Sequence, residues 1–284
     1  MRRDRSFLEQ IPFAKQDYGD IVQTDYPGAH DEAYRRRVNE LVDQSEETWP
    51  DIPRYDYTDE EREVWSLVSE VLIPLQNRYS CDAFLKGRDR LDLPDQRLPQ
   101  LDDVSAKMEE KTGFMLAPVG GLLDQSEFLP MLAKKVMRCT PYVRHAENPF
   151  FTPEPDIIHE LRGHAPMFMH QPFVDLSVQI GEAAAAAVEA GDEELLELIG
   201  LFYWYTVEYG LIREDGEIKI FGAGNNGGIQ DLLRSVDPTV EKKPFDLDKI
   251  KELTIDYDAP QQVFYVAESY EQITEIAHEL MRMA

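Results

Sequence analysis

Two histidines near the middle of the chain, His159 and His164, are the first candidates for a chemical role. The HExxH pattern that binds zinc places its histidines four residues apart, so that both share one face of a helix. In the segment 159–164, which reads HELRGH, they are five residues apart, or about 140° around a regular helix. Both reach one metal if the helix ends between them, and Gly163 and Pro166 favour such an end. The alternative is two unrelated histidines near a helix terminus.

Glu208 is the candidate for a third ligand. It is the one ionisable carboxylate in the apolar run 200–212, which reads GLFYWYTVEYGLI. Burying a carboxylate is costly unless it is paired or binds a metal, although the side chain could also point outward or meet an arginine. Two histidines and one carboxylate with open positions form the facial triad suited to iron(II) and oxygen chemistry. Zinc can occupy the same ligands, so the triad alone leaves the metal open.

The elements that must position these residues follow from the spacing of apolar side chains. Helices are expected at 31–47, 58–73, 101–112, 126–137, 152–164, 173–190, 192–212 and 270–284. Thr152 is expected to cap the histidine-bearing helix, Pro74 to end the second helix and Pro130 to lie near the first turn of the fourth. A short strand and turn are expected at 114–123, a hairpin at 214–224 and a loop at 87–100.

The predicted fold class is therefore mainly α with a few short β-strands. A single domain is expected at 25–284, after an irregular N-terminal arm at 1–24. The two cysteines, Cys81 and Cys139, are expected to be reduced and buried, as in a cytoplasmic protein. The N-terminal residues lack the apolar stretch of a secretory signal, and no apolar run approaches the roughly 18 residues of a membrane span.

The chain is strongly acidic, with 29 basic and 55 acidic residues and a net charge of −26. Binding to nucleic-acid phosphates or to anionic membranes needs a basic surface, so the charge argues against both kinds of partner. The acidity agrees equally with a protein adapted to a high-salt cytoplasm and with an ordinary acidic protein.

Several further segments appear in a fixed order, namely APVGGLLDQSEFL at 117–129, CTPYVRHAENPFFTPEPDIIHELRGHAPMF at 139–168, YWYTVEYGLI at 203–212, IFGAG at 220–224 and YVAES at 265–269. On these segments the chain resembles the pterin-dependent aromatic amino acid hydroxylases over roughly residues 25–275, and it is most similar to their bacterial phenylalanine 4-hydroxylase branch. The resemblance implies the catalytic domain alone, as a monomer. It also implies iron(II), a tetrahydropterin and molecular oxygen as co-substrate.

The resemblance carries roles to individual residues. It implies His159, His164 and Glu208 as iron ligands, and Arg144 as the residue that binds the carboxylate of the amino acid substrate through a bidentate guanidinium grip. Asp156 would orient that arginine. The pterin site would comprise Gly121, Leu123, Phe128, Glu160 and Tyr203, with Phe128 stacked on the ring, and the amino-acid pocket would comprise Thr152, Pro153, Trp204 and Gly227.

The segment Asn225-Asn226-Gly227-Gly228 departs from the Leu-Leu-Ser-Ser that is usual in the family. Gly227 stands where family members have a serine near the substrate, so the resemblance implies that a hydroxyl is lost at that position. L-phenylalanine, converted to L-tyrosine, is the default substrate that the resemblance implies. The alternatives are the same chemistry on tryptophan or on a non-aromatic amino acid, a zinc-dependent hydrolase built on the same triad, and a non-catalytic relative, which retention of the whole triad disfavours.

Overall fold

The computed structural model describes residues 4–15, 26–255 and 260–284. The fold is mostly helical, with six short strands among the described residues. The α-helices are α1 (Pro27–His30), α2 (Glu32–Thr48), α3 (Asp59–Tyr79), α4 (Asp82–Leu91), α5 (Leu101–Thr112), α6 (Gln125–Ala133), α7 (Gln171–Ala190), α8 (Glu193–Tyr203), α9 (Ala223–Gly227), α10 (Ile229–Val236), α11 (Leu247–Ile250) and α12 (Tyr270–Met283). Short 3₁₀ turns lie at η1 (Ser6–Leu8) and η3 (Met167–Met169), and π-helical turns at η2 (His159–His164) and η4 (Trp204–Glu208).

Capping residues set the starts of the helices much as the sequence predicts. Asp31 accepts hydrogen bonds from two backbone N–H groups at the start of α2. Thr58 and Glu61 form a complete capping box at the start of α3, each side chain satisfying a backbone N–H that the helix leaves free. Gly113 ends α5 in the left-handed conformation at φ 75°. These termini confirm the expected helices in the first half of the chain.

Several expectations about helix ends are wrong. The expected helix at 192–212 ends early, because a strand begins at Leu211. Pro74 lies inside α3, which continues to Tyr79. The last turn is held by Gln76, whose side-chain amide is fully buried and donates to the backbone oxygens of Arg162 and Asn226, so tertiary contacts offset the bond that the proline removes. The expected loop at 87–100 is also wrong in its first part, because α4 extends to Leu91, whose side chain is buried in the core.

The strands form two small sheets. β1 (Met115–Pro118) and β2 (Val136–Cys139) pair in parallel, with α6 between them along the chain. The expected helix at 126–137 is therefore wrong in its last part, and Pro130 lies in the second half of α6 rather than near its first turn. The second sheet has the order β4-β3-β6-β5, formed by β3 (Leu211–Glu214), β4 (Glu217–Ile220), β5 (Glu241–Pro244) and β6 (Val263–Ala267). Asp215 and Gly216, at φ 49° and 82°, make the expected tight turn between β3 and β4.

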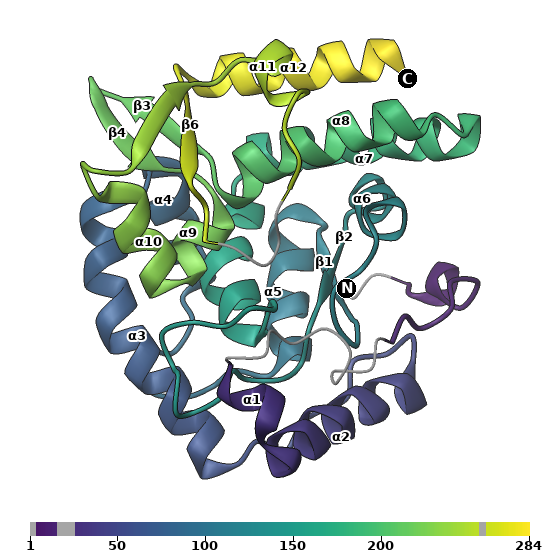
Figure 1. Ribbon diagram of the computed structural model, residues 1–284. Coiled ribbons are helices and arrows are strands. Elements are labelled where there is room, and N and C mark those ends of the chain that lie inside the picture. The colour runs from purple at the N-terminus through teal and green to yellow at the C-terminus, as the bar shows by residue number, and fades with distance from the viewer. Residues whose placement is uncertain (1–3, 16–25, 256–259) are drawn as a thin grey trace.

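The elements surround one continuous apolar core (Figure 1). Helices α7, α8 and α12 stack at one end of the molecule, α2 closes the opposite end, and α3 runs along one side between them (Figure 1). A second, smaller cluster of buried side chains joins Leu8 in the N-terminal segment to the β1–β2 pair. Cys81 and Cys139 are free, buried thiols, as expected.

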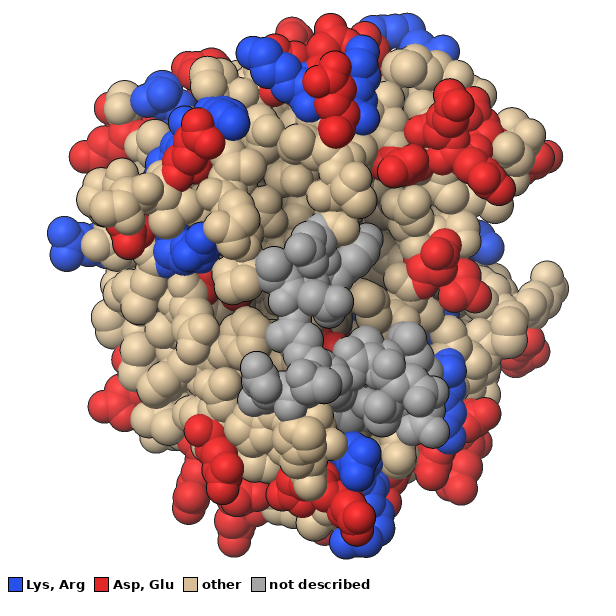
Figure 2. Space-filling model, viewed as in Figure 1, with Lys and Arg blue, Asp and Glu red and all other residues tan. Residues whose placement is uncertain are grey.

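Many of the acidic side chains lie on the surface of the molecule (Figure 2). On the face shown in Figure 2, acidic side chains gather around the rim and outnumber basic ones, while the described residues near the middle are mostly uncharged. No helix among residues 4–15, 26–255 and 260–284 is both long and apolar enough to cross a membrane.

Candidate active site

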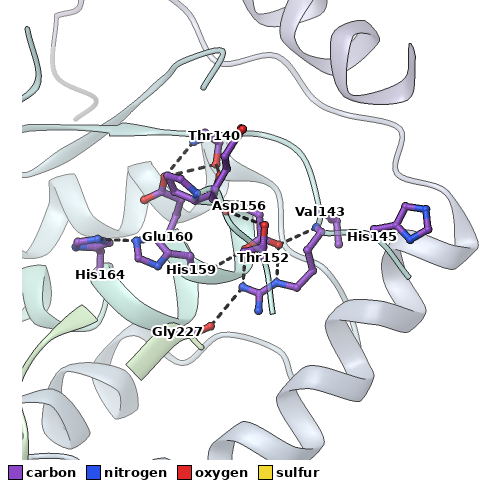
Figure 3. Close-up of polar contacts among 12 residues, drawn as sticks. Thr140, Val143, His145, Thr152, Asp156, His159, Glu160, His164 and Gly227 are labelled. Carbon is purple, nitrogen blue, oxygen red and sulfur yellow. Dashed lines mark hydrogen bonds and ion pairs between the residues drawn. The ribbon is translucent and has the colours of Figure 1, made fainter. Parts of the chain in front are cut away.

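The two histidines lie on a π-helical turn rather than at a helix end. In η2 the backbone N–H of Ala165 donates to the oxygen of Glu160 at 2.9 Å, which is an i→i+5 bond. Residues five apart in such a turn share a face, so the spacing of His159 and His164 places both rings on one side. Their Nε2 atoms are 3.0 Å apart, and the two rings point toward one another in Figure 3. The expected break in the helix is therefore wrong, because the extra residue is absorbed by a wider turn.

The N-terminus of this helix differs from the expectation as well. Helical geometry begins at Ile157, and Asp156 accepts a hydrogen bond from the backbone N–H of His159 at 3.0 Å. Thr152, the expected cap, instead donates its hydroxyl to the oxygen of Glu154 at 2.8 Å. A proline disfavours helical geometry in the residue before it, and the two prolines at 153 and 155 are followed by the helix rather than included in it.

Glu208 meets the two histidines from a second π-helical turn. In η4 the N–H of Tyr209 donates to the oxygen of Trp204 at 2.8 Å, again an i→i+5 bond. The Glu208 carboxylate lies 3.0 Å from Nε2 of His164 and 3.7 Å from Nε2 of His159. Two imidazole nitrogens and one carboxylate oxygen therefore converge on one point, which is the donor set of a facial triad. All three side chains are at least four-fifths buried, at 17%, 3% and 13% exposed.

The electrostatics of this group suit a cation. Burial lowers the pKa of His159 to about 4, which keeps its imidazole neutral near pH 7. Burial would also lower the pKa of His164, but the charge of Glu208 outweighs it and the pKa is raised. Burial opposes ionisation of Glu208, yet the histidines, His164 first, bring its pKa below the usual range. A metal bound here would take the place of the proton that His164 and Glu208 share.

Glu160 is a fourth group near the same point. One carboxylate oxygen of Glu160 and one ring nitrogen from each of His159 and His164 lie within 4.8 Å of one another. Its Oε1 accepts hydrogen bonds from the backbone N–H and the hydroxyl of Thr140, at 3.3 and 3.4 Å (Figure 3). Burial raises its pKa to about 8. The Glu208 carboxylate lies 3.0 and 3.7 Å from the two histidine nitrogens, whereas Glu160 already accepts two hydrogen bonds from Thr140. Glu208 is therefore the better third ligand, and Glu160 lies beside the metal position.

Gly163 has a packing role in place of the expected helix-breaking role. A Cβ on Gly163 would lie 2.5 Å from the backbone oxygen of Ala223 and 3.2 Å from the Cα of Gly227. A Cβ on Gly227 would lie 2.9 Å from the Cα of His159. Glycines at both positions therefore let α9 press against η2, which fixes the backbone of the histidine turn.

Arg144 and Asp156 form a buried ion pair beside the triad. Nε and Nη2 of Arg144 donate to the two oxygens of Asp156 at 3.0 and 2.6 Å, and both side chains are at most 1% exposed. Nη2 also donates to the oxygen of Gly227 at 3.3 Å. Asp156 thus holds the arginine and caps the histidine helix at once. The Asp156 carboxylate occupies Nε and Nη2 of the guanidinium group. The nitrogen that remains to donate to a substrate carboxylate is Nη1, which has no partner among the described residues.

One cavity brings most of the predicted site residues together. Its lining includes Arg144, Thr152, Pro153, His159, Glu160, His164, Tyr203, Trp204 and Glu208, together with Gly121 and Leu123 of the loop after β1 and Phe128 of α6. Gly121 adopts φ 137°, which side chains rarely reach, so this loop needs glycine to turn into the cavity. The rings of Phe128 and Tyr203 meet edge to face, with centroids 5.5 Å apart.

Asp156 and Gly227 lie behind the wall of the cavity rather than on its lining. The same holds for the rest of the unusual segment. Asn225 and Asn226 are fully buried and donate their amides to the backbone oxygens of Tyr209 and Gly222 at 3.0 and 2.9 Å. The departure at 225–228 therefore alters the support of the site more than the surface that a ligand meets.

Sequence reasoning missed several residues of the lining, including Gln125, Arg138, Glu154, Asp231 and Ile255. Glu154 is 3% exposed, and neither of its carboxylate oxygens has a hydrogen-bond partner among the described residues. Burial raises its pKa to about 7. A glutamate between two prolines gives no periodic signal in the sequence, so its burial follows from the tertiary fold.

The chain matches the family model described as biopterin-dependent aromatic amino acid hydroxylase over residues 6–283. It is 38% identical to the chloroplastic phenylalanine 4-monooxygenase of Pinus taeda over 264 residues, which cover 91% of this chain and 72% of that protein. It is 39% identical to tyrosine 3-monooxygenase of Canis lupus familiaris over 256 residues, 88% of this chain. The chain spans about half the length of that relative, at 51%.

Solved structures show the same fold. The phenylalanine hydroxylase of Chromobacterium violaceum with bound iron(III) and oxidised cofactor 7,8-dihydrobiopterin superposes with a TM-score of 0.73 and 27% identity, covering 80% of this chain and 82% of that one. The apo, cold-active phenylalanine hydroxylase of Colwellia psychrerythraea 34H also gives a TM-score of 0.73, with 26% identity over 81% of this chain and 88% of that one. The predicted mainly helical fold is confirmed.

Proposed function

The chain belongs to the biopterin-dependent aromatic amino acid hydroxylases, and from that membership we propose that it hydroxylates free L-phenylalanine to L-tyrosine, using iron(II), a tetrahydropterin and molecular oxygen. The observation that carries this proposal is the convergence of His159, His164 and Glu208 in one cavity with an arginine whose Nη1 is unpaired. A buried nitrogen and oxygen donor set with open positions suits iron(II), and an unpaired guanidinium nitrogen suits a carboxylate.

The triad would hold the iron, which together with the reduced pterin supplies the oxygen-activating chemistry when both are bound. The protein's own part is to hold the reactants in place. The two π-turns fix the ligands. Asp156 fixes the orientation of Arg144, so that Nη1 of Arg144 can donate to the carboxylate of a substrate bound in one orientation. The apolar lining, with Phe128, Tyr203 and Trp204, excludes water from the reacting groups.

Gly121 and Leu123 of the loop after β1 and Phe128 of α6 are proposed to hold the pterin, with the Phe128 ring against the ring of the cofactor. Glu160 and Tyr203 would complete that side of the cavity. Glu160 would offer hydrogen-bonding oxygens to the cofactor, with one of them already held by Thr140.

Thr152, Pro153 and Trp204 are proposed to wall the amino-acid pocket, and Gly227 to act from behind it by accepting from Arg144. Phenylalanine is favoured over a non-aromatic side chain because the lining is rich in aromatic and proline surface. The unusual residues Asn225 and Asn226 bond to backbone oxygens and do not line the cavity, which argues against the alternative of a different amino acid substrate. We further propose that the chain is a monomer. We also propose that it acts in the cytoplasm, a reducing compartment that agrees with its two free thiols.

The test is product analysis on iron(II)-loaded protein supplied with tetrahydrobiopterin and a panel of phenylalanine, tryptophan, tyrosine and leucine. The proposal expects a mass gain of one oxygen on phenylalanine and identification of the product as L-tyrosine. Conversion of another amino acid in its place would replace the proposed substrate, and zinc-dependent hydrolysis with no oxygenated product would reject the proposed chemistry.

A further inference from the structure

Asp231 is an acidic residue on the lining of the cavity that has no part in the proposed metal, pterin or carboxylate sites. It lies in the first turn of α10 and lines the same cavity as Arg144 and Tyr209. Its side chain is half-buried, and its carboxylate forms no hydrogen bond or ion pair with another side chain of the described residues. A carboxylate in such a place is costly unless a ligand compensates it.

No neighbouring side chain among the described residues compensates the charge of the Asp231 carboxylate by direct contact. Burial raises its pKa to about 6, and the charges of Arg144 and Arg234 oppose that rise without direct contact. Arg234 is engaged elsewhere, because its guanidinium donates to the backbone oxygen of Gln261 at 2.6 Å and to the side chain of Gln262 at 3.2 Å. Arg144 is engaged with Asp156 through Nε and Nη2.

The unusual glycine pair makes room for this carboxylate. A Cβ on Gly228 would lie 2.6 Å from Oδ2 of Asp231, so the carboxylate packs directly over the Cα of that glycine. A side chain at 228 would displace it. Gly227 lets α9 press on the histidine turn, and Gly228 lets Asp231 sit at the cavity, so the two glycines serve different neighbours.

The cavity therefore presents two opposite charges that do not touch each other. Nη1 of Arg144 has no partner among the described residues. The carboxylate of Asp231 accepts a hydrogen bond from its own backbone N–H, and no described side chain bonds to it. The Arg144 and Asp231 charges are close enough to perturb each other's pKa, yet they form no ion pair. A zwitterion, with a carboxylate and an ammonium on one carbon, carries the complementary pair of charges.

We propose that Asp231 binds the α-ammonium group of the amino acid whose carboxylate is held by Arg144. The inference rests on the proposed function and adds to it a reason why the enzyme takes amino acids rather than simple carboxylic acids. An acid that lacks the amino group leaves Asp231 unpaired in the cavity and forfeits a charged hydrogen bond.

The test compares two ligands that differ in that group alone, L-phenylalanine and 3-phenylpropanoate. Their dissociation constants are measured by calorimetry on the iron(II)-loaded full chain, for the wild type, Asp231→Asn and the control Asp59→Asn. Asp59 lies in the first turn of α3 and its side chain is 96% exposed, so the control makes the same chemical change away from the cavity.

The wild type and the control should bind L-phenylalanine roughly 10- to 100-fold more tightly than 3-phenylpropanoate, the range of one charge-assisted hydrogen bond. Asp231→Asn should reduce that ratio to near one, through weaker binding of phenylalanine, while its affinity for 3-phenylpropanoate is kept or improved. Retained binding of 3-phenylpropanoate also shows that the variant is folded.

The outcomes separate the two proposals. An unchanged ratio in Asp231→Asn, or an equal loss for both ligands, overturns the role of Asp231 while phenylalanine binding by the wild type upholds the substrate class. If the wild type binds neither ligand, the proposed substrate class fails and the role of Asp231 fails with it.

Discussion

Glu154 gives a prediction whose size can be worked out from the structure. Its side chain is buried, both carboxylate oxygens lack partners among the described residues, and burial alone raises its pKa from 4.5 to about 7. The folded state therefore binds this proton more tightly than the unfolded chain does. Stability is lost as the pH rises from about 4.5 to about 7, where the buried carboxyl must ionise, and the loss is complete above that range.

The magnitude follows from the two pKa values. A tenfold change in proton affinity is worth about 1.36 kcal/mol, so ionisation of Glu154 lowers the free energy of unfolding by about 3 kcal/mol at pH 8. The substitution Glu154→Gln removes the charge and keeps the shape. We expect the variant to be more stable than the wild type by about 3 kcal/mol at pH 8 and by under about 1 kcal/mol at pH 5.

The assay is urea unfolding of metal-free protein at pH 5 and pH 8, followed by circular dichroism. The exposed Glu147→Gln serves as the control, because it removes the same charge seven residues away and should change stability by less than about 0.5 kcal/mol at either pH. A Glu154→Gln variant that is no more stable at pH 8, or that gains equally at both pH values, would show that the ionised carboxylate has a partner that compensates it.

Three further substitutions test the framework of the site. Gly163→Ala should lower stability by about 1–3 kcal/mol and reduce iron affinity, because the new Cβ meets the backbone of α9, and iron retention with unchanged thermal stability would contradict this. Asp156→Ala should cost about 3–5 kcal/mol in urea unfolding by leaving Arg144 buried without its partner, whereas a cost below about 1 kcal/mol would mean that the ion pair is dispensable. Thr58→Ala should cost about 1 kcal/mol and leave the Kd for iron unchanged, and a change in that Kd would argue against a purely local cap.

Much of the scaffold could be predicted from the sequence. Helix starts at Asp31 and Thr58 and the turn at Asp215-Gly216 follow from local chemistry, and the structure has all three. The errors occur where tertiary contacts override that chemistry. Pro74 does not end α3, since the buried amide of Gln76 secures the following turn against distant backbone oxygens.

In the site, too, some features follow from the local sequence and others depend on tertiary contacts. The ligand residues could be proposed from type and spacing, but the π-turns that bring them together could not, because i→i+5 bonding leaves no distinct pattern in a sequence. Gly163 is needed at its position because a Cβ there would meet the backbone oxygen of Ala223, and this contact between distant segments cannot be inferred from the local sequence. Glu154 and Asp231 reach the cavity through long-range folding, which local patterns do not report.

The most direct test of the account is the iron content of purified protein loaded anaerobically with iron(II) and then desalted. We compare the wild type with His159→Ala, His164→Ala, Glu208→Ala and the control His278→Ala, which lies on α12 outside the cavity. The account predicts about one iron per chain in the wild type and the control, and a loss of at least tenfold in affinity in each ligand variant. Full iron retention in the Glu208→Ala variant, or equal loss in His278→Ala, would contradict the assignment of the triad.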